Sequence, residues 1–284
     1  MIRRAPAFLF VLLLGAQQSG EFKFQHLAKG YRFTEGPAWN VRDQYLVFSD
    51  TPNDRIYKWV PGSDPVVFRE DAHGPAGNAF DSQGRLYTCE TRARRVTRTE
   101  RNGKIEVLAE KWDGKRLNAP TGIAVGKNGS VYFTDPAFGS QTDRRELDFH
   151  GVYHIPPRGA MTLIARYPTR PRGIALAPGG RTLYVSNADE HNVRAFDLDR
   201  SGEASGERVL IANIEGVPGG IAVDEKGLLY VVAKGIGIYN PEGKRVGYLG
   251  ITERTSAAAF GEADLKSLFL TARGEVFRVR PDAP

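Results

Sequence analysis

The sequence is poor in several features that would point to particular classes of protein. It has one cysteine, Cys89, which excludes an internal disulfide and a zinc cluster built on cysteines. Its five histidines lack metal-binding spacing, and neither His-Glu-x-x-His nor the Gly-x-Ser-x-Gly element of serine hydrolases occurs. No segment has a sustained helical period. With 41% hydrophobic residues and 29 aromatic ones, the chain is nevertheless expected to fold around a core.

Glycine is in excess, at 32 of 284 residues, without the Gly-X-Y period of collagen. Many tight turns, and therefore many short strands, are expected. The net charge of +6 does not indicate nucleic-acid binding, because the densest basic run, 92–101, alternates with Ala, Val and Thr like one face of a strand.

The N-terminus has the pattern of an export signal. Arg3 and Arg4 precede an apolar run over 5–14 and the small residues Gly15 and Ala16. We predict a signal peptide over 1–20, cut after Ala16, and a single domain over 21–284 that is periplasmic or extracellular and has no stable membrane span. An uncleaved membrane anchor is the alternative, although the run is short for one.

A pattern of an apolar pair, a polar turn and a β-rich triplet recurs six times. Equivalent points in the six copies are spaced by 40, 45, 52, 46 and 39 residues. These points are Val47, Tyr87, Tyr132, Tyr184, Tyr230 and Phe269. Four short strands per period of about 45 residues are typical of a propeller blade. The sequence therefore predicts an all-β, six-bladed β-propeller, with the segment 22–33 as the outer strand that closes the last blade.

The repeat also predicts where a site would lie. The loop that enters each innermost strand opens on the central channel, so one position per blade should ring the channel mouth. These positions are Glu35, Ala76, Thr121, Arg172, Gly219 and Ser256.

Several motifs resemble the senescence marker protein, gluconolactonase and luciferin-regenerating enzyme family, over about residues 22–280. The carriers are Thr34-Glu35-Gly36-Pro37-Ala38-Trp39, Phe48-Ser49-Asp50, Phe80-Asp81-Ser82-Gln83-Gly84-Arg85-Leu86 and Gly129-Ser130-Val131-Tyr132-Phe133-Thr134-Asp135-Pro136. The resemblance implies hydrolysis of sugar lactones or related esters. It also implies a divalent cation such as Ca²⁺ or Zn²⁺ at the channel mouth, held by a Glu, Asn side chains and an Asp.

The sequence departs from the family at these ligand positions. Glu35 matches, but Ala76, Thr121, Arg172 and Gly219 stand where the resemblance implies Asn or Asp. Ala76 and Gly219 offer no side-chain oxygen, and the charge of Arg172 opposes a cation. We expect an incomplete metal site in which the Arg172 guanidinium takes the place of the ion and pairs with Glu35. The alternative is that Arg172 points to solvent and water fills the centre.

Other residues are weaker candidates. Glu90, Asn118, Asp135 and Asn187 end strands or flank loops and are candidates for binding a sugar-like ligand, with a turn or cap role as the alternative. His73 and Glu90 are the candidates for a metal-free catalytic base.

Three functions remain open. The protein is a lactonase-type hydrolase with an altered site, a non-catalytic propeller that binds a sugar-like or lactone ligand, or an interaction module that binds a protein partner.

Overall fold

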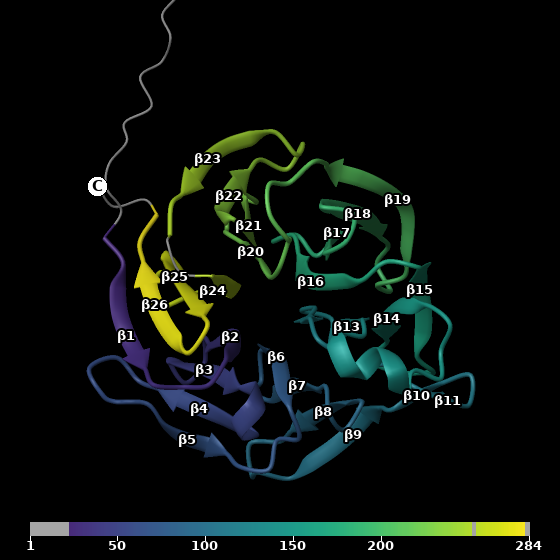
Figure 1. Cartoon of the computed structure of the whole chain (residues 1–284), viewed down its shortest axis with the longest axis horizontal. Coiled ribbons are helices and arrows are strands. Elements are labelled where there is room, and N and C mark those ends of the chain that lie inside the picture. Colours follow the sequence, from purple (N-terminus) through teal and green to yellow (C-terminus); the bar gives the residue numbers. More distant parts are fainter. Residues whose placement is uncertain (1–22, 252–253, 282–284) are drawn as a thin grey trace, which may run out of the picture.

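The computed structural model describes residues 23–251 and 254–281. In this part of the chain, strands form six four-stranded antiparallel sheets around a central axis (Figure 1). The predicted all-β, six-bladed propeller is confirmed. The predicted signal peptide lies outside the described residues. Within them, no helix combines the length and hydrophobicity needed to cross a membrane.

Blades 1 to 3 follow one another along the chain, and each runs from the innermost to the outermost strand. Blade 1 contains β2 (Thr34–Asn40), β3 (Tyr45–Asp50), β4 (Arg55–Trp59) and β5 (Val66–Arg69), with the short 3-10 helix η1 (Thr51–Asn53). Blade 2 contains β6 (Pro75–Phe80), β7 (Leu86–Glu90), β8 (Arg95–Thr99) and β9 (Ile105–Ala109), and the hairpin β10 (Lys111–Trp112) and β11 (Lys115–Arg116) follows it. Blade 3 contains β12 (Ile123–Val125), β13 (Val131–Asp135), the 3-10 helix η2 (Gly139–Arg144), β14 (His150–Ile155) and β15 (Thr162–Tyr167).

Blades 4 to 6 repeat the same order. Blade 4 contains β16 (Pro171–Leu176), β17 (Thr182–Asn187), β18 (Asn192–Leu198) and β19 (Ala204–Ile211). Blade 5 contains β20 (Ile221–Val223), β21 (Leu229–Ala233), β22 (Gly235–Tyr239) and β23 (Arg245–Leu249). Blade 6 contains β24 (Thr255–Gly261), β25 (Ser267–Ala272), β26 (Glu275–Val279) and, as its outer strand, β1 (Gln25–Lys29).

The ring is closed by pairing between strands from the two ends of the chain. β1 pairs antiparallel with β26, as predicted for the segment 22–33. Because β1 precedes blade 1 in the sequence, this pairing fastens blade 6 to blade 1. The closure covers an edge of β26 that would otherwise be open to pairing with another chain.

The six repeat points explain the core. All of them lie on the second strand of a blade and are buried. Tyr132 packs with Ile174 and Leu183 of the next blade, and Phe269 packs with Trp39 and Phe48 across the closure. A large, mostly apolar side chain at this position therefore fills the space between neighbouring blades, which is why it recurs.

Candidate functional site

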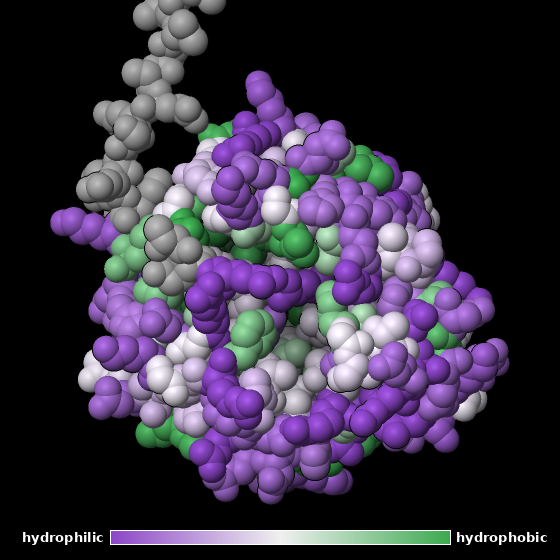
Figure 2. Space-filling model, in the orientation of Figure 1, coloured by the Kyte–Doolittle hydropathy of each residue, from purple (hydrophilic) through white to green (hydrophobic). Residues whose placement is uncertain are grey.

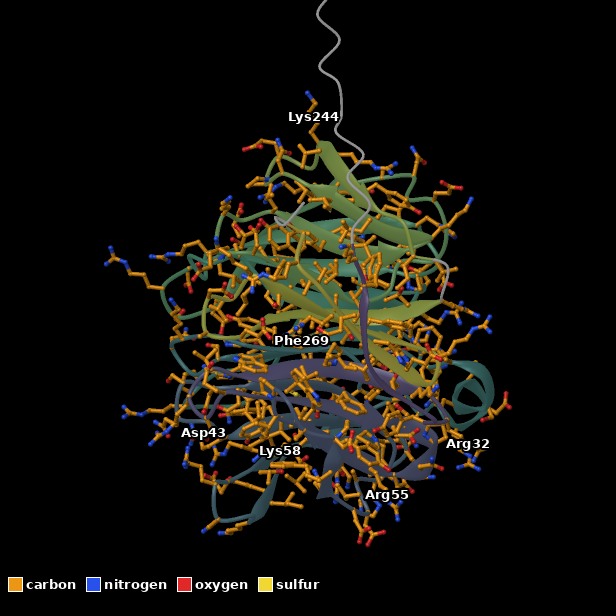
Figure 3. The ribbon with its side chains drawn as sticks, turned by 90° about the vertical axis from the view of Figure 1, so that its left-hand side faces the viewer. Arg32, Asp43, Arg55, Lys58, Lys244 and Phe269 are labelled. Atoms are coloured by element: carbon orange, nitrogen blue, oxygen red, sulfur yellow. The ribbon has the colours of Figure 1, made fainter. Side chains whose placement is uncertain are left out.

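The antiparallel order of each blade decides which loops meet at each end of the channel. The start of the first strand pairs with the end of the second, as in Thr34 with Asp50 and Pro75 with Glu90. The ring positions and the turns after each second strand therefore lie at one end, which we call the mouth face. The turns between first and second strands lie at the other end, the turn face. Figure 3 shows Arg32 of the mouth face and Asp43 of the turn face on opposite sides of the molecule.

Glycines bring the backbones of the blades close together around the channel. A Cβ atom at Gly77 would overlap the Thr121 carbonyl oxygen, and one at Gly122 would overlap the carbonyl of Arg172. Gly77 instead donates its backbone N–H to the Thr121 carbonyl at 2.8 Å. The glycine that follows a ring position is thus required by the next blade, which explains part of the glycine excess.

Arg172 and Glu35 meet across the channel. Arg172 lies near the start of β16, and Glu35 lies near the start of β2. The Arg172 Nη2 donates to Glu35 Oε1 at 2.8 Å. Their side chains are 19% and 11% exposed. Both line a cavity of about 80 Å³, together with Thr121 and Ser256. In Figure 2, the mouth face is hollowed near its centre and bordered by hydrophilic side chains.

The other ring positions either donate a hydroxyl group to a backbone carbonyl or have no polar side chain. Thr121 Oγ1 donates to the Ala119 carbonyl at 2.9 Å, and Ser256 Oγ donates to the carbonyl of Thr34 at 2.8 Å. Ala76 is buried. A Cβ atom at Gly219 would lie 2.7 Å from the Ser256 carbonyl oxygen and 3.5 Å from Arg172 Nη1, so glycine leaves room at the guanidinium.

These donors do not fit a divalent cation of the kind that the resemblance implies. Ca²⁺ takes about 6–8 oxygen ligands, and a catalytic Zn²⁺ takes about three protein ligands and a water. Glu35 supplies the only ring carboxylate among the described residues, and that carboxylate already accepts from a guanidinium. The carbonyls of Ala76, Arg172 and Gly219 accept hydroxyl groups of the preceding blade at 2.7–2.9 Å. In the described chain, no three His, Cys, Asp or Glu side chains gather as a metal site would require.

A second cavity on the mouth face was not predicted. It has about 290 Å³ and is lined by side chains from the turns of blades 1 and 2, by Asn118 and by η2, which faces the viewer in Figure 1. Three arginines line it, namely Arg92, Arg94 and Arg144. Arg92 pairs with Asp54 and Arg94 with Glu146, whereas Arg144 has no partner among the described residues. The only sequence signal for it was the long spacing of 52 residues between Tyr132 and Tyr184, which contains η2.

Asn118 is the predicted ligand-binding residue that lies at this cavity. It is 3% exposed, and its Nδ2 donates to the carbonyls of Asp135 and Phe149 at 3.0 and 2.9 Å. These two acceptors fix the orientation of the amide. Its Oδ1 is buried and has no partner in the described part of the chain, so the amide lies at the cavity without presenting its oxygen to it.

Glu90 belongs to the scaffold rather than to a cavity. Its side chain is fully buried at the end of β7. It accepts from Arg69 at 2.5 Å, from Arg95 at 2.6 Å and from Thr97 at 2.8 Å. With both oxygens held by donors, Glu90 is poorly placed to act as the catalytic base for which it was a candidate.

Asp135 and Asn187 hold turns. Asp135 is fully buried and accepts the backbone N–H groups of Asn118 and Ala119 at 2.7 and 2.8 Å. Burial raises the pKa of Asp135 to about 7, although the two N–H donors oppose this shift. Asn187 Oδ1 accepts the N–H groups of Asp189 and Glu190, both at 3.1 Å. Both residues thus have the alternative role considered from the sequence, that of a turn or cap residue.

His73 and Cys89 lie outside the two cavities. His73 is exposed, with a left-handed backbone (φ 52°) in the loop before β6. Cys89 is buried, and burial raises the pKa of its thiol, which fits an inert core residue.

Comparison with known proteins shows the family to which the chain belongs. Residues 33–274 match the model of the SMP-30/Gluconolactonase/LRE-like region. A gluconolactonase of Zymomonas mobilis is 30% identical over 89% of this chain and 80% of that protein. The structure of a gluconolactonase from Xanthomonas campestris superimposes with a TM-score of 0.84 at 30% identity, covering 92% of this chain and 90% of that one.

A calcium-binding regucalcin from Agrobacterium tumefaciens shares the fold with a TM-score of 0.78. It is 17% identical, and the match covers 91% of this chain and 95% of that one. The family match and the two gluconolactonases cover nearly the whole propeller and agree with each other. The chain belongs to the SMP-30/gluconolactonase/LRE-like family.

Proposed function

We propose that this protein binds a sugar lactone or a related ester at the mouth face and that it has lost cation-dependent hydrolysis. The family supports the ligand class, since it includes gluconolactonases. One observation carries the loss: the guanidinium of Arg172 is bonded to Glu35 at the channel mouth, where the resemblance implies a cation. A fixed positive charge beside a single carboxylate repels a divalent ion.

The central cavity supplies complementary contacts for such a ligand. Arg172 offers N–H donors to a lactone carbonyl oxygen, and Glu35 Oε2 offers an acceptor to a hydroxyl group. A polyhydroxylated ring carries both kinds of group. Binding therefore requires no metal ion.

Metal content and lactone hydrolysis test the proposal together. Purified protein should hold no stoichiometric Ca²⁺ or Zn²⁺, and a panel of aldonolactones should be turned over at the same low rate with added cation or with chelator. A bound ion that a chelator removes together with activity would contradict the proposal. Lactone binding is measured separately by calorimetry.

A paired substitution sharpens this test. Arg172→Asn with Gly219→Asp returns an amide and a carboxylate to the ring, so added Ca²⁺ should raise the melting temperature of this variant and not that of the wild type. Arg172→Asn with Gly219→Ala is the matched control, because it introduces the same Cβ beside the Ser256 carbonyl without a ligand.

Cation-independent hydrolysis is the second candidate. It is favoured by the bonding of Glu35 through Oε1 alone, which leaves Oε2 without a partner among the described residues. Oε2 would take a proton from water as the water oxygen adds to the lactone carbonyl, with Arg172 stabilising the oxyanion. The ring C–O bond then breaks, and its oxygen takes the proton from Glu35. Chelator-resistant turnover that Glu35→Gln abolishes would establish this candidate.

We also propose that the protein is exported, with the sequence pattern of residues 1–20 as the support. N-terminal sequencing of protein recovered outside the cytoplasm should begin after Ala16. Recovery of an intact N-terminus in the membrane fraction would indicate an uncleaved anchor instead.

A further inference from the structure

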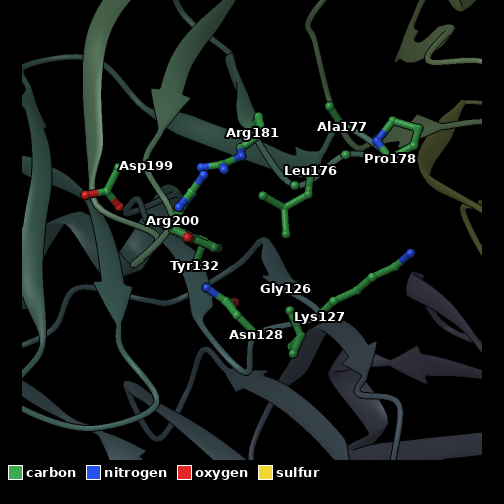
Figure 4. Close-up of a pocket in the computed structure, with 13 residues that line it drawn as sticks. Gly126, Lys127, Asn128, Tyr132, Leu176, Ala177, Pro178, Arg181, Asp199 and Arg200 are labelled. Carbon is green, nitrogen blue, oxygen red and sulfur yellow. The ribbon is translucent and has the colours of Figure 1, made fainter.

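A separate cavity of about 380 Å³ lies on the turn face, between blades 3 and 4. It is formed by the turn after β12, the turn after β16 and the turn that joins β18 to β19 (Figure 4). Its apolar part includes Val125, Leu176 and Pro178. Since the ring positions lie at the other end of the blades, this cavity is independent of the proposed lactone site.

Two arginines in this cavity lack the carboxylate partners that most arginines of the chain have. Arg181 and Arg200 both line it, and neither side chain has a partner among the described residues. Arg98, by contrast, is bonded to both Glu100 and Glu106. In Figure 4, the nitrogen ends of Arg181 and Arg200 lie on the same side of the cavity, whereas Lys127 extends away from them. Both residues are exposed, so water screens their charges in part, but two guanidinium groups at one cavity favour an anion there.

The carboxylate of Asp199, the one acidic side chain in the lining, is used to build the turn that carries Arg200. Its Oδ1 accepts from the Ser201 N–H at 2.8 Å, the Ser201 hydroxyl at 2.7 Å and the Glu203 N–H at 2.9 Å. Tyr132 lies beside this turn and donates its hydroxyl to the Gly202 carbonyl at 2.8 Å. The turn is therefore held in place before any ligand arrives, and among the described residues Asp199 forms no ion pair with either arginine.

We infer that this cavity binds a small organic anion, with its carboxylate or phosphate group at Arg181 and Arg200 and its apolar ring on Leu176. Both arginines offer a planar set of N–H donors that suits either acidic group. The Asn128 amide adds a donor, because its Oδ1 already accepts the Ser130 N–H at 3.0 Å. The volume suits a ligand of small-molecule size and is larger than a lone inorganic ion needs.

Titration of the full chain with four simple anions tests the inference. Benzoate and phenyl phosphate carry an apolar ring, whereas acetate and inorganic phosphate do not. We expect saturable binding of at least one ring-bearing anion with a Kd of about 1 mM, at least about tenfold tighter than its ringless counterpart. The better of benzoate and phenyl phosphate identifies the acidic group. Ligand-observed NMR and calorimetry provide the measurements.

Substitutions locate the binding. Arg181→Gln and Arg200→Gln should each weaken it at least about tenfold. Arg158→Gln is the matched control, because Arg158 is exposed on the neighbouring β14–β15 turn and outside the cavity lining, and it should leave the Kd unchanged. Equal affinity for ringless anions, binding that survives both cavity substitutions in folded protein, or no saturation at about 50 mM would each overturn the inference. Lactone binding at the mouth face is unaffected in either case, so the two proposals fail separately.

Discussion

Two carboxylates, Glu35 and Glu90, lie on neighbouring blades and both pair with arginine, yet their surroundings differ. Glu90 is fully buried and receives three donors, two of them guanidinium groups. The Glu35 side chain is 11% exposed, receives one donor from the far side of the channel and faces a cavity. A carboxylate saturated by its own scaffold stabilises the fold, whereas one with a free oxygen at a cavity is available to a ligand.

The same substitution at both carboxylates should separate these roles most strongly. Glu90→Gln removes the charge that balances the buried Arg69, and we expect the free energy of unfolding to fall by about 3–5 kcal/mol. Glu35→Gln weakens a single charged hydrogen bond and leaves an amide oxygen that still accepts from Arg172, so its expected loss is about 2 kcal/mol. Urea unfolding measures both, and lactone binding should change only in Glu35→Gln. Similar losses at the two positions would break the comparison.

At the channel mouth, the close approach of neighbouring backbones recurs from blade to blade, whereas the side chains differ. Gly122 allows a test of this close approach, since a Cβ atom there would overlap the Arg172 carbonyl. We expect Gly122→Ala to lower the free energy of unfolding by about 1–3 kcal/mol, because the blades must separate to admit the methyl group. Gly179→Ala is the matched control, as its Cβ would meet no atom within 4 Å. Equal stability of the two variants in urea would show that the ring is looser than this geometry.

The fold was predictable because its periodic features are local. A buried second-strand residue such as Tyr132 recurs with each blade, and the segment that became β1 was predicted from the strand missing in the last copy. The contact between Glu35 and Arg172 followed from the repeat too, because equivalent positions in a propeller converge on one channel. The repeat placed both residues at the channel mouth, and the structure decides for their pairing over the alternative in which Arg172 points to solvent.

The parts that were missed depend on packing between blades and on an insertion. Arg69 reaches Glu90 from the outer strand of the preceding blade, and the sequence gives no sign of that contact. The residues between β13 and β14 were visible in the sequence only as extra length, which indicated neither the helix η2 nor the cavity beside it. Asp135 lies in a motif that resembles the family and was a candidate for binding a ligand. Its carboxylate instead accepts two backbone N–H groups and holds a turn.

Asp135 extends the comparison to a carboxylate that is buried without a cation bonded to it. Its pKa, about 7 in the folded protein against 3.8 ordinarily, means that the folded state keeps a proton which the unfolded chain releases. This contribution to stability is fully present below pH 3.8 and is lost as the pH rises to about 7.

The free energy of unfolding of Asp135→Asn should therefore decline less than that of the wild type between pH 4 and pH 7. The amide side chain of this variant is uncharged throughout this range. It has one acceptor oxygen for the two backbone N–H groups that Asp135 accepts, and the resulting loss of stability is similar at every pH. Asp143→Asn, an exposed substitution in η2, is the control and should keep the wild-type slope. Urea unfolding at pH 4, 5.5 and 7 gives the slope of the free energy of unfolding against pH for the wild type and the two variants. If all three are the same, Asp135 ionises normally, and backbone donors alone support a buried carboxylate as well as the arginines support Glu90.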